Sequence, residues 1–350
     1  MFITIHDIST LILISLFLLN NVNALATLAV AGTAFAQSSV TISGKLIYGY
    51  EATKSAAGAK ANGLRVTDGD VNFAATEDLG GGLKATASIA VLTRGRDTAI
   101  SGRDASVSLS GGFGSVMIGS IEAGNGILGL GGAGAPVYGL DDGVTLAGAS
   151  NVDIIKYTAP AMNGLTFSVS ATDSTATKSA AVAATDTEFA AAGGTLGMGS
   201  TATTQDSTGF GVGYAAGPLA AAADYTSYGA NAAVAATGKV LADTRTRVSA
   251  SYDLGMAKVG LGYQTATNVA NVSKKENVFG VSVPMGALTL GMVVASSKTD
   301  GVAGTNKGTD LGAKYALSKR TFIAAAYQTT KAAGATASAS KYRIQLGHSF

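Results

Sequence analysis

The feature that most constrains this chain is a two-residue alternation of apolar and polar side chains, which returns many times between residues 40 and 350. The clearest run is Lys341–Phe350, where every second residue from Tyr342 onward is apolar or aromatic, His348 excepted. A period of two puts one set of side chains on each face of a β-strand. No long segment competes with the 3.6-residue period of a helix. The chain is therefore predicted to be all-β.

The connections between these runs alternate in length. Gly and Pro mark short turns, because they supply positive φ or a preset turn angle. The short turns are predicted at residues 78–82, 110–114, 160–164, 216–218, 253–256, 284–286 and 316–320, and the longer polar connections at residues 121–151, 172–207, 229–243, 267–276, 297–308 and 329–339. Short turns at one end and long loops at the other, with an even count of sixteen strands, are typical of an outer-membrane barrel.

The composition favours a barrel in lipid over a soluble sheet protein. Charged residues make up 13% of the chain and hydrophobic residues 47%, and that charge is low for a soluble surface of this size. In a soluble sandwich the apolar faces would meet in a core, whereas in a wide barrel they face lipid and the polar faces line a wet lumen. A soluble β-solenoid or adhesin is the alternative, but no fixed short repeat supports a solenoid. We expect a transmembrane antiparallel β-barrel.

The N-terminal segment differs from the rest of the chain. An apolar run at Leu11–Leu19 is followed by a second one that ends in Ala34 and Ala36, a pair of small residues that fits a signal cleavage site. The alternative is a membrane anchor, but the asparagines at positions 20, 21 and 23 interrupt the apolar run, which is shorter than a spanning helix needs. Residues 1–36 are predicted to be a signal peptide and residues 37–350 the barrel domain.

The residues that most enzymes and cofactor sites need are scarce. The chain has no Cys, two His and a formal charge of +2, so we expect no catalysis, no metal site and no nucleic-acid partner. Gly124–Gly129 matches the G-x-G-x-x-G pattern, but a dinucleotide site also needs a following helix and a later acid. We therefore expect no cofactor and interpret these glycines as a tightly turning loop.

Six segments, spread in order from Ala36 to Phe350, carry a family resemblance: Ala36–Thr41, Thr76–Lys84, Leu109–Gly114, Lys156–Pro160, Tyr315–Thr321 and Tyr342–Phe350. They are similar to the general diffusion porins of Gram-negative outer membranes, most closely the sixteen-stranded trimeric type of β-proteobacteria. The resemblance implies a homotrimer of water-filled barrels with short periplasmic turns, long extracellular loops and a third loop folded into each lumen.

The same resemblance implies a function and a set of partners. Small hydrophilic solutes and ions would pass by passive diffusion through the outer membrane, which the chain reaches by export through the periplasm. A substrate-specific channel and a structural or adhesive barrel are the alternatives. The implied partners are outer-membrane lipid, lipopolysaccharide and the assembly machinery. Tyr342–Phe350 resembles the terminal strand that this machinery reads, which makes Phe350 a candidate assembly signal.

Three basic positions typical of the family are absent. Asp70 stands where an Arg usually precedes the Glu-Asp-Leu-Gly segment, and Gly119–Ile121 replaces a Gly-Arg-Gln. A third usual Arg falls in the region of Ser150 and Asn151. Strong anion selectivity is therefore not expected, and the sign of the pore's field is left open.

A pore selects by the charges at its narrowest point. We expect acids of the third loop, Glu122, Asp141 and Asp142, to face bases across this constriction. Strand parity places the following basic side chains on the lumenal face: Lys45, Lys84, Lys156, Arg245, Arg247, Lys258, Lys314, Lys341 and Arg343. By the same parity Arg103 points outward, at the rim. Because the chain has no Trp, the aromatic girdles must use Tyr and Phe.

Overall fold

The computed structural model describes residues 39–94, 100–122, 126–140, 144, 151–173, 205–229 and 242–350. The predicted signal peptide lies outside these residues. The described residues form sixteen strands and one short helix: β1 (Ser39–Lys54), β2 (Lys60–Gly80), β3 (Leu83–Leu92), β4 (Ser101–Gly111), β5 (Gly114–Glu122), α2 (Gly126–Gly131), β6 (Asn151–Thr158), β7 (Leu165–Asp173), β8 (Ser207–Ala216), β9 (Leu219–Tyr228), β10 (Ala242–Asp253), β11 (Lys258–Asn268), β12 (Ser273–Met285), β13 (Leu288–Thr299), β14 (Asn306–Ala316), β15 (Thr321–Lys331) and β16 (Ala339–Ser349).

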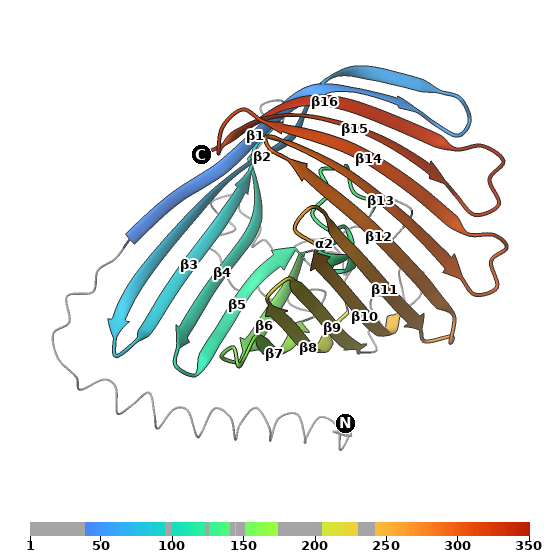
Figure 1. Ribbon diagram of the computed structural model, residues 1–350. Coiled ribbons are helices and arrows are strands. Elements are labelled where there is room, and N and C mark those ends of the chain that lie inside the picture. Colours follow the sequence, from blue (N-terminus) through green and yellow to red (C-terminus); the bar gives the residue numbers. More distant parts are fainter. Residues whose placement is uncertain are drawn as a thin grey trace, which may run out of the picture.

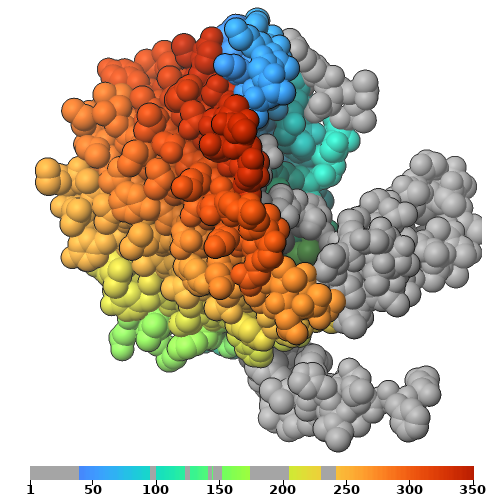
Figure 2. All heavy atoms as spheres, turned by 90° about the vertical axis from the view of Figure 1, so that its right-hand side faces the viewer, coloured from blue at the N-terminus to red at the C-terminus, as the bar shows by residue number. Residues whose placement is uncertain are grey.

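Each strand pairs antiparallel with its chain neighbours, and β16 pairs with β1 to close the barrel (Figure 1). Lys45 lies opposite Ser349 and Tyr48 opposite Leu346 in this closing pair. Figure 2 shows the blue N-terminal strands beside the red C-terminal ones. Closure leaves no strand edge without a partner, which is a requirement for a sheet in lipid. The predicted sixteen-stranded barrel is confirmed.

The outer face of the barrel is apolar and exposed. In β16, Tyr342, Ile344 and Leu346 are 45–57% exposed, whereas the intervening Gln345 is 8% exposed. This is the reverse of a soluble protein, in which such side chains would be buried, and it fits contact with lipid. The candidate girdle aromatics are all exposed: Tyr48, Tyr50, Phe167, Tyr225, Tyr252, Tyr263, Phe279 and Tyr315.

Three of the long connections, 267–276, 297–308 and 329–339, are much shorter than the sequence predicted. β11 continues to Asn268 and β12 begins at Ser273, so most of the expected 267–276 loop is strand. The hydroxyls of Thr267 and Ser273 lie 2.9 Å apart across this pair. The 329–339 connection shortens in the same way, because β15 runs to Lys331. Polar residues suggested loops there, but backbone pairing extends as long as a partner strand is present.

The barrel has a small apolar core inside the lumen rather than between two sheets. Val278, Val293 and Ala295, on β12 and β13, pack against Ile127, Leu140 and Val144 of the chain between β5 and β6. This part of the inner wall is therefore apolar, although the sequence predicted a polar lumen throughout. No helix among the described residues is long and apolar enough to cross a membrane.

Candidate pore constriction

The third long connection, between β5 and β6, enters the barrel and lies on the inner wall of β10–β16. Its described part, residues 126–140 and 144, is called the lumenal loop below. It begins with the one-turn helix α2, where the sequence analysis expected a turning loop at Gly124–Gly129, so that expectation was wrong for Gly126–Gly129. The turn forms although glycine is a poor helix former, and the Gly132 amide extends it by donating to the Leu128 carbonyl at 2.8 Å. The predicted folding of the third loop into the lumen is confirmed (Figure 1).

Hydrogen bonds from neighbouring strands hold the lumenal loop in place. Ser282 Oγ donates to the Ala133 carbonyl at 2.7 Å, and Gln328 Nε2 donates to the Gly139 carbonyl at 2.6 Å. The Gly139 amide in turn donates to Asp310 Oδ2 at 3.0 Å. These bonds come from β12, β14 and β15, so the loop is attached at several points along the wall.

The wall beneath the loop is built from glycines at lumen-facing strand positions. A Cβ at Gly280 would lie 2.5–2.6 Å from backbone atoms of Gly131 and Gly132, and one at Gly291 would lie 2.6 Å from the Pro136 ring. A Cβ at Gly312 would meet the Pro136 carbonyl oxygen. Six strand glycines would bring an added Cβ too close to the lumenal loop, and together they are called the glycine seat: Gly260, Gly262, Gly280, Gly291, Gly308 and Gly312. Only glycine lets the backbone or side chains of the loop approach the sheet so closely.

At the far end of the lumenal loop, Tyr138 contacts two of the predicted basic residues. The Arg343 guanidinium carbon lies 3.8 Å and the Lys341 ammonium 4.7 Å from the ring centroid of Tyr138. Arg343 also donates to the Val137 carbonyl at 3.3 Å. Within the described residues, the Tyr138 hydroxyl has no hydrogen-bond partner. Burial, and to a smaller extent the charge of Glu51, raise the pKa of Tyr138 above its ordinary value.

Acid–base pairs continue from this point along the inner wall of β1 and β2. Glu51 lies opposite Arg343 in the register of β1 and β16, and its Oε1 is 2.6 Å from Arg65. Neither Glu51 nor Arg65 was among the predicted site residues. Parity could have identified Glu51, because it shares the face of Lys45. It could not have identified Arg65, because a register shift near Ile47/Tyr48 separates Arg65 from the rest of β2.

A second charged group lies on β1–β5. Lys45 Nζ is 2.6 Å from Asp68 and 3.7 Å from Asp70. Arg103 is 3.3 Å from Asp70 and 3.0 Å from Glu122. Asp70, at the position where the family usually has an Arg, therefore lies between two cations and partly neutralises them.

The predicted outward position of Arg103 at the rim is wrong, because its guanidinium lies beside Asp70 and Glu122. Ile89 pairs with Ala105 but Val91 pairs with Gly102, so Arg103 and Asp104 together face a single residue of β3. Such a bulge breaks the two-residue alternation. Arg103 consequently turns toward the lumenal Asp70 rather than toward lipid.

The remaining predicted bases are spread along the barrel. Arg247 pairs with Asp224 at 2.8 Å, and Arg245 lies 5.8 Å from the ring centroid of Tyr228, so both are on the wall of β9 and β10. Four lysines lie within two residues of a strand end at the short turns, away from the lumenal loop: Lys84, Lys156, Lys258 and Lys314. Asp141 and Asp142 lie outside the described residues.

Comparison with known proteins agrees with this geometry. The sequence profile of the Gram-negative porin family matches residues 23–335. No curated protein sequence matches the chain significantly. Among solved structures, the anion-selective porin from Comamonas acidovorans is 22% identical with a TM-score of 0.67, covering 90% of this chain and 100% of its own.

Two further solved structures have the same fold. A mutant of the Rh. blastica porin is 15% identical with a TM-score of 0.62, covering 89% of this chain and 100% of its own. The trimer form of OmpT from Vibrio cholerae is 14% identical with a TM-score of 0.59, covering 89% and 99%. At these identities the structures establish the fold, and the profile match over most of the chain establishes the family. The chain belongs to the Gram-negative porin family and forms an outer-membrane channel for diffusion.

Proposed function

We propose that the channel passes small hydrophilic solutes and ions with weak ion selectivity, and that its constriction lies beside the lumenal loop. The observation that carries this proposal is the contact of Tyr138 with Lys341 and Arg343, because it brings the loop against charged strands. The acid Glu51 and the base Arg65 belong to the same region. Asp141 and Asp142 follow directly in the sequence and remain candidates for its acidic side.

Weak selectivity is supported by the way the lumenal charges are paired. Lys45, Arg65 and Arg103 each lie within 4 Å of a carboxylate, as do Arg247 and Lys274. A charge that is paired with an opposite charge projects a smaller electric field into the pore than an isolated one. The remaining field is therefore set by the small difference between the positive and negative charges that line the lumen. The candidate bases near the short turns, such as Lys84 and Lys258, would then act on ions only at the exit.

Reversal potentials in planar bilayers test this proposal. Across a tenfold KCl gradient we expect large, open conductance steps and a reversal potential well below the ~59 mV of an ideally selective pore. A value near that limit would overturn weak selectivity. Complete blockade by one class of solute would instead indicate a substrate-specific channel. An unchanged potential in an Asp141→Asn/Asp142→Asn variant would remove these two acids from the constriction.

Assembly as a homotrimer is proposed from the family and from the trimer form of its structural relative. We also propose that residues 1–36 direct export through the periplasm, and that the assembly machinery reads the C-terminal strand. In support of the last point, Phe350 exchanges two backbone hydrogen bonds of 3.0 Å with Gly44 at the barrel's closing seam. Phe350 as a whole is 46% exposed, so it is accessible to a partner.

Deleting Phe350 should lower the amount of assembled trimer, because it removes both the exposed ring and the last hydrogen bonds of the seam. The measurement is heat-modifiable trimer in isolated outer membranes. Phe350→Tyr keeps the aromatic ring and the backbone bonds, so it should assemble normally. Undiminished trimer after the deletion would contradict an assembly role for Phe350.

A further inference from the structure

Three aromatic side chains on the lumenal side of the barrel each lie against a basic side chain. On β9 and β10, the Arg245 guanidinium carbon is 5.8 Å from the ring centroid of Tyr228. On β14 and β15, the Lys314 ammonium is 5.4 Å from the ring centroid of Phe322. The third ring is Tyr138 of the lumenal loop, which contacts two cations of β16. These three places are called the aromatic stations below.

The two strand rings of the stations belong to the inner face of the barrel. Tyr228 shares a face of β9 with the buried Thr226, and Phe322 shares a face of β15 with the buried Ala324. Phe322 also lies opposite Gly347, where an added Cβ would overlap its ring. Glycine at position 347 therefore makes room for the ring on the inner wall. All three station rings are partly exposed, so a solute in the lumen can touch them.

The cations of the stations differ from the lumenal cations that pair with acids. Salt bridges between described residues use another set of bases: Lys45, Arg65, Arg103, Arg247 and Lys274. None of the four cations that contact a station ring belongs to this set. On β10, for example, Arg247 is 2.8 Å from Asp224, whereas Arg245 on the same face lies over Tyr228. The station cations are therefore held by rings and keep their positive charge for a solute.

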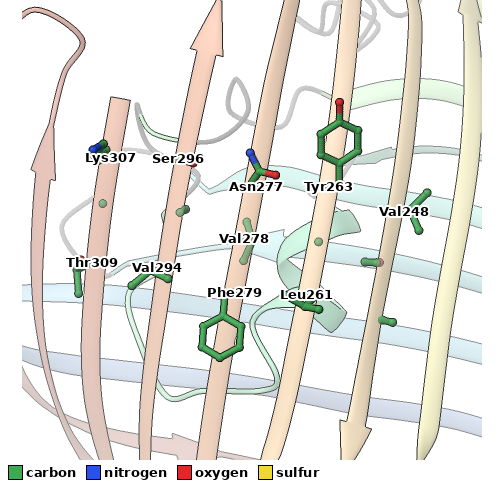
Figure 3. A pocket seen from close by; sticks show the side chains of 15 residues that line it. Val248, Leu261, Tyr263, Asn277, Val278, Phe279, Val294, Ser296, Lys307 and Thr309 are labelled. Atoms are coloured by element: carbon green, nitrogen blue, oxygen red, sulfur yellow. The ribbon is translucent and has the colours of Figure 1, made fainter. Parts of the chain in front are cut away.

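The outer face of the barrel carries many rings as well, yet the four cation–ring contacts between described residues are all lumenal. A groove on the outer face across β10–β14 is lined by Tyr263, Phe279 and Lys307, among others. Figure 3 shows Lys307 at one side of this groove and Tyr263 at the other, with strands between them. Chance proximity of lysines and rings would produce contacts on this face too. The pairing therefore follows the path of the solute.

A cation beside a ring is complementary to a ligand that carries an anion beside a ring. The ligand's carboxylate accepts charge-assisted hydrogen bonds from the cation, and its ring packs against the station ring in an offset or edge-to-face geometry. A guanidinium serves both contacts, because it stacks on a ring and binds a carboxylate through its edge. An aliphatic carboxylate would meet only the cation, and a neutral aromatic solute only the ring.

We propose that the channel favours aromatic carboxylates over aliphatic carboxylates of the same charge and size. Such a solute would meet Tyr228 at the long-loop end, Tyr138 beside the lumenal loop and Phe322 at the short-turn end. Each station binds weakly, which suits transport, because conduction needs sites that a solute can also leave. The inference rests on the proposed diffusion function and names a preferred substrate class for it, while KCl continues to pass.

The test is the KCl current through single channels in planar bilayers, titrated with benzoate or with cyclohexanecarboxylate. These two anions have the same charge and nearly the same size, but only benzoate is aromatic. We expect brief, partial reductions of the current, with a half-blocking concentration about two- to tenfold lower for benzoate. Benzamide, which has the ring without the charge, should block less than benzoate.

Two variants connect this preference to the stations. Tyr228→Leu/Phe322→Leu removes two rings and keeps the cations, so the half-blocking concentrations of the two anions should move closer together. Their ratio is the relevant quantity, because a change in the exposure of the cations acts equally on both anions. The matched control is Tyr225→Leu, which removes an exposed outer ring from the same strand, β9, and should keep the wild-type ratio.

Equal half-blocking concentrations of the two anions in wild type would overturn the proposal, because the rings would then only hold the cations against the wall. An unchanged ratio in the double variant would overturn it as well. The wild-type comparison needs no variant, so it holds even if the double variant assembles poorly. Normal KCl conductance without a preference for benzoate would reject the aromatic stations alone, whereas the absence of conductance would reject the channel itself.

Discussion

Gly280→Val should narrow the channel. The new side chain would occupy the space of the Gly131 and Gly132 backbone, which lies 2.5–2.6 Å from the position of its Cβ. Valine itself suits a β-strand, so the strand can remain and the lumenal loop must move away from the wall, toward the pore axis. We expect a lower single-channel conductance, a smaller solute size limit and a loss of about 1–3 kcal/mol in unfolding free energy from overpacking.

The matched control for this change is Gly112→Val. A Cβ at Gly112 meets nothing within 4 Å, and this glycine lies in the short turn between β4 and β5, outside the glycine seat. It should conduct as wild type. If Gly280→Val assembled normally and had wild-type conductance, the glycine seat would not set the position of the loop. Gly312→Val provides an independent repeat on β14, because its side chain would meet the Pro136 carbonyl.

Much of the barrel was predictable because the same rule applies to every strand. One face of the strand contacts lipid and is apolar, and the other face lines the lumen and is more polar. Arg343 and Lys341 were assigned to the lumen by parity alone, and the structure places both against the lumenal loop. The closing pair of β1 and β16 also follows from a terminal strand that keeps its alternation to its last residues.

The errors arose where a local irregularity breaks that rule. Arg103 was placed outward because a bulge has no reliable sequence signature, and one inserted residue reverses every later assignment on the strand. The position of Asp70 between Lys45 and Arg103 could not be predicted for the same reason. It depends on Arg103 of β4, whose predicted direction was wrong.

The lumenal loop was the hardest part to derive from the residues, since its contacts lie more than a hundred positions away along the chain. A signal was nevertheless present in the glycines at positions 260, 262 and 280, which occupy lumen-facing places in strands. A glycine in the middle of a strand often marks the close approach of another backbone. Because glycine is common in turns and loops, these strand glycines did not indicate the surface on which the loop rests.

Tyr138→Ala should release the tip of the lumenal loop and shift the channel toward anions. The variant removes the ring that lies 3.8 Å from Arg343 and 4.7 Å from Lys341. Each such contact contributes about 0.5–1 kcal/mol at a partly exposed site, so the loop should lose roughly 1–2 kcal/mol of attachment. Both cations then face the pore with less cover. We expect noisier, larger conductance steps and a reversal potential displaced toward that of chloride.

Tyr138→Phe separates the ring from the hydroxyl. It keeps both cation contacts and removes a buried hydroxyl without a hydrogen-bond partner among the described residues, so its conductance and selectivity should match wild type. If Tyr138→Phe behaved like Tyr138→Ala, the hydroxyl rather than the ring would hold the loop. If neither variant changed the reversal potential, Tyr138 would not shape the constriction.

The pH dependence of the unfolding free energy of wild type and of Tyr138→Phe gives an independent check on the burial of Tyr138. Because folding raises the pKa of Tyr138 above its ordinary value of 10.0, the folded state favours the protonated hydroxyl. The stability that this group contributes is therefore complete below about pH 10 and is lost as the pH rises through the raised pKa. The difference in unfolding free energy between wild type and Tyr138→Phe should be constant up to about pH 10 and should move in favour of Phe above it. A difference that stayed constant well above pH 10 would show that burial does not raise the pKa of Tyr138.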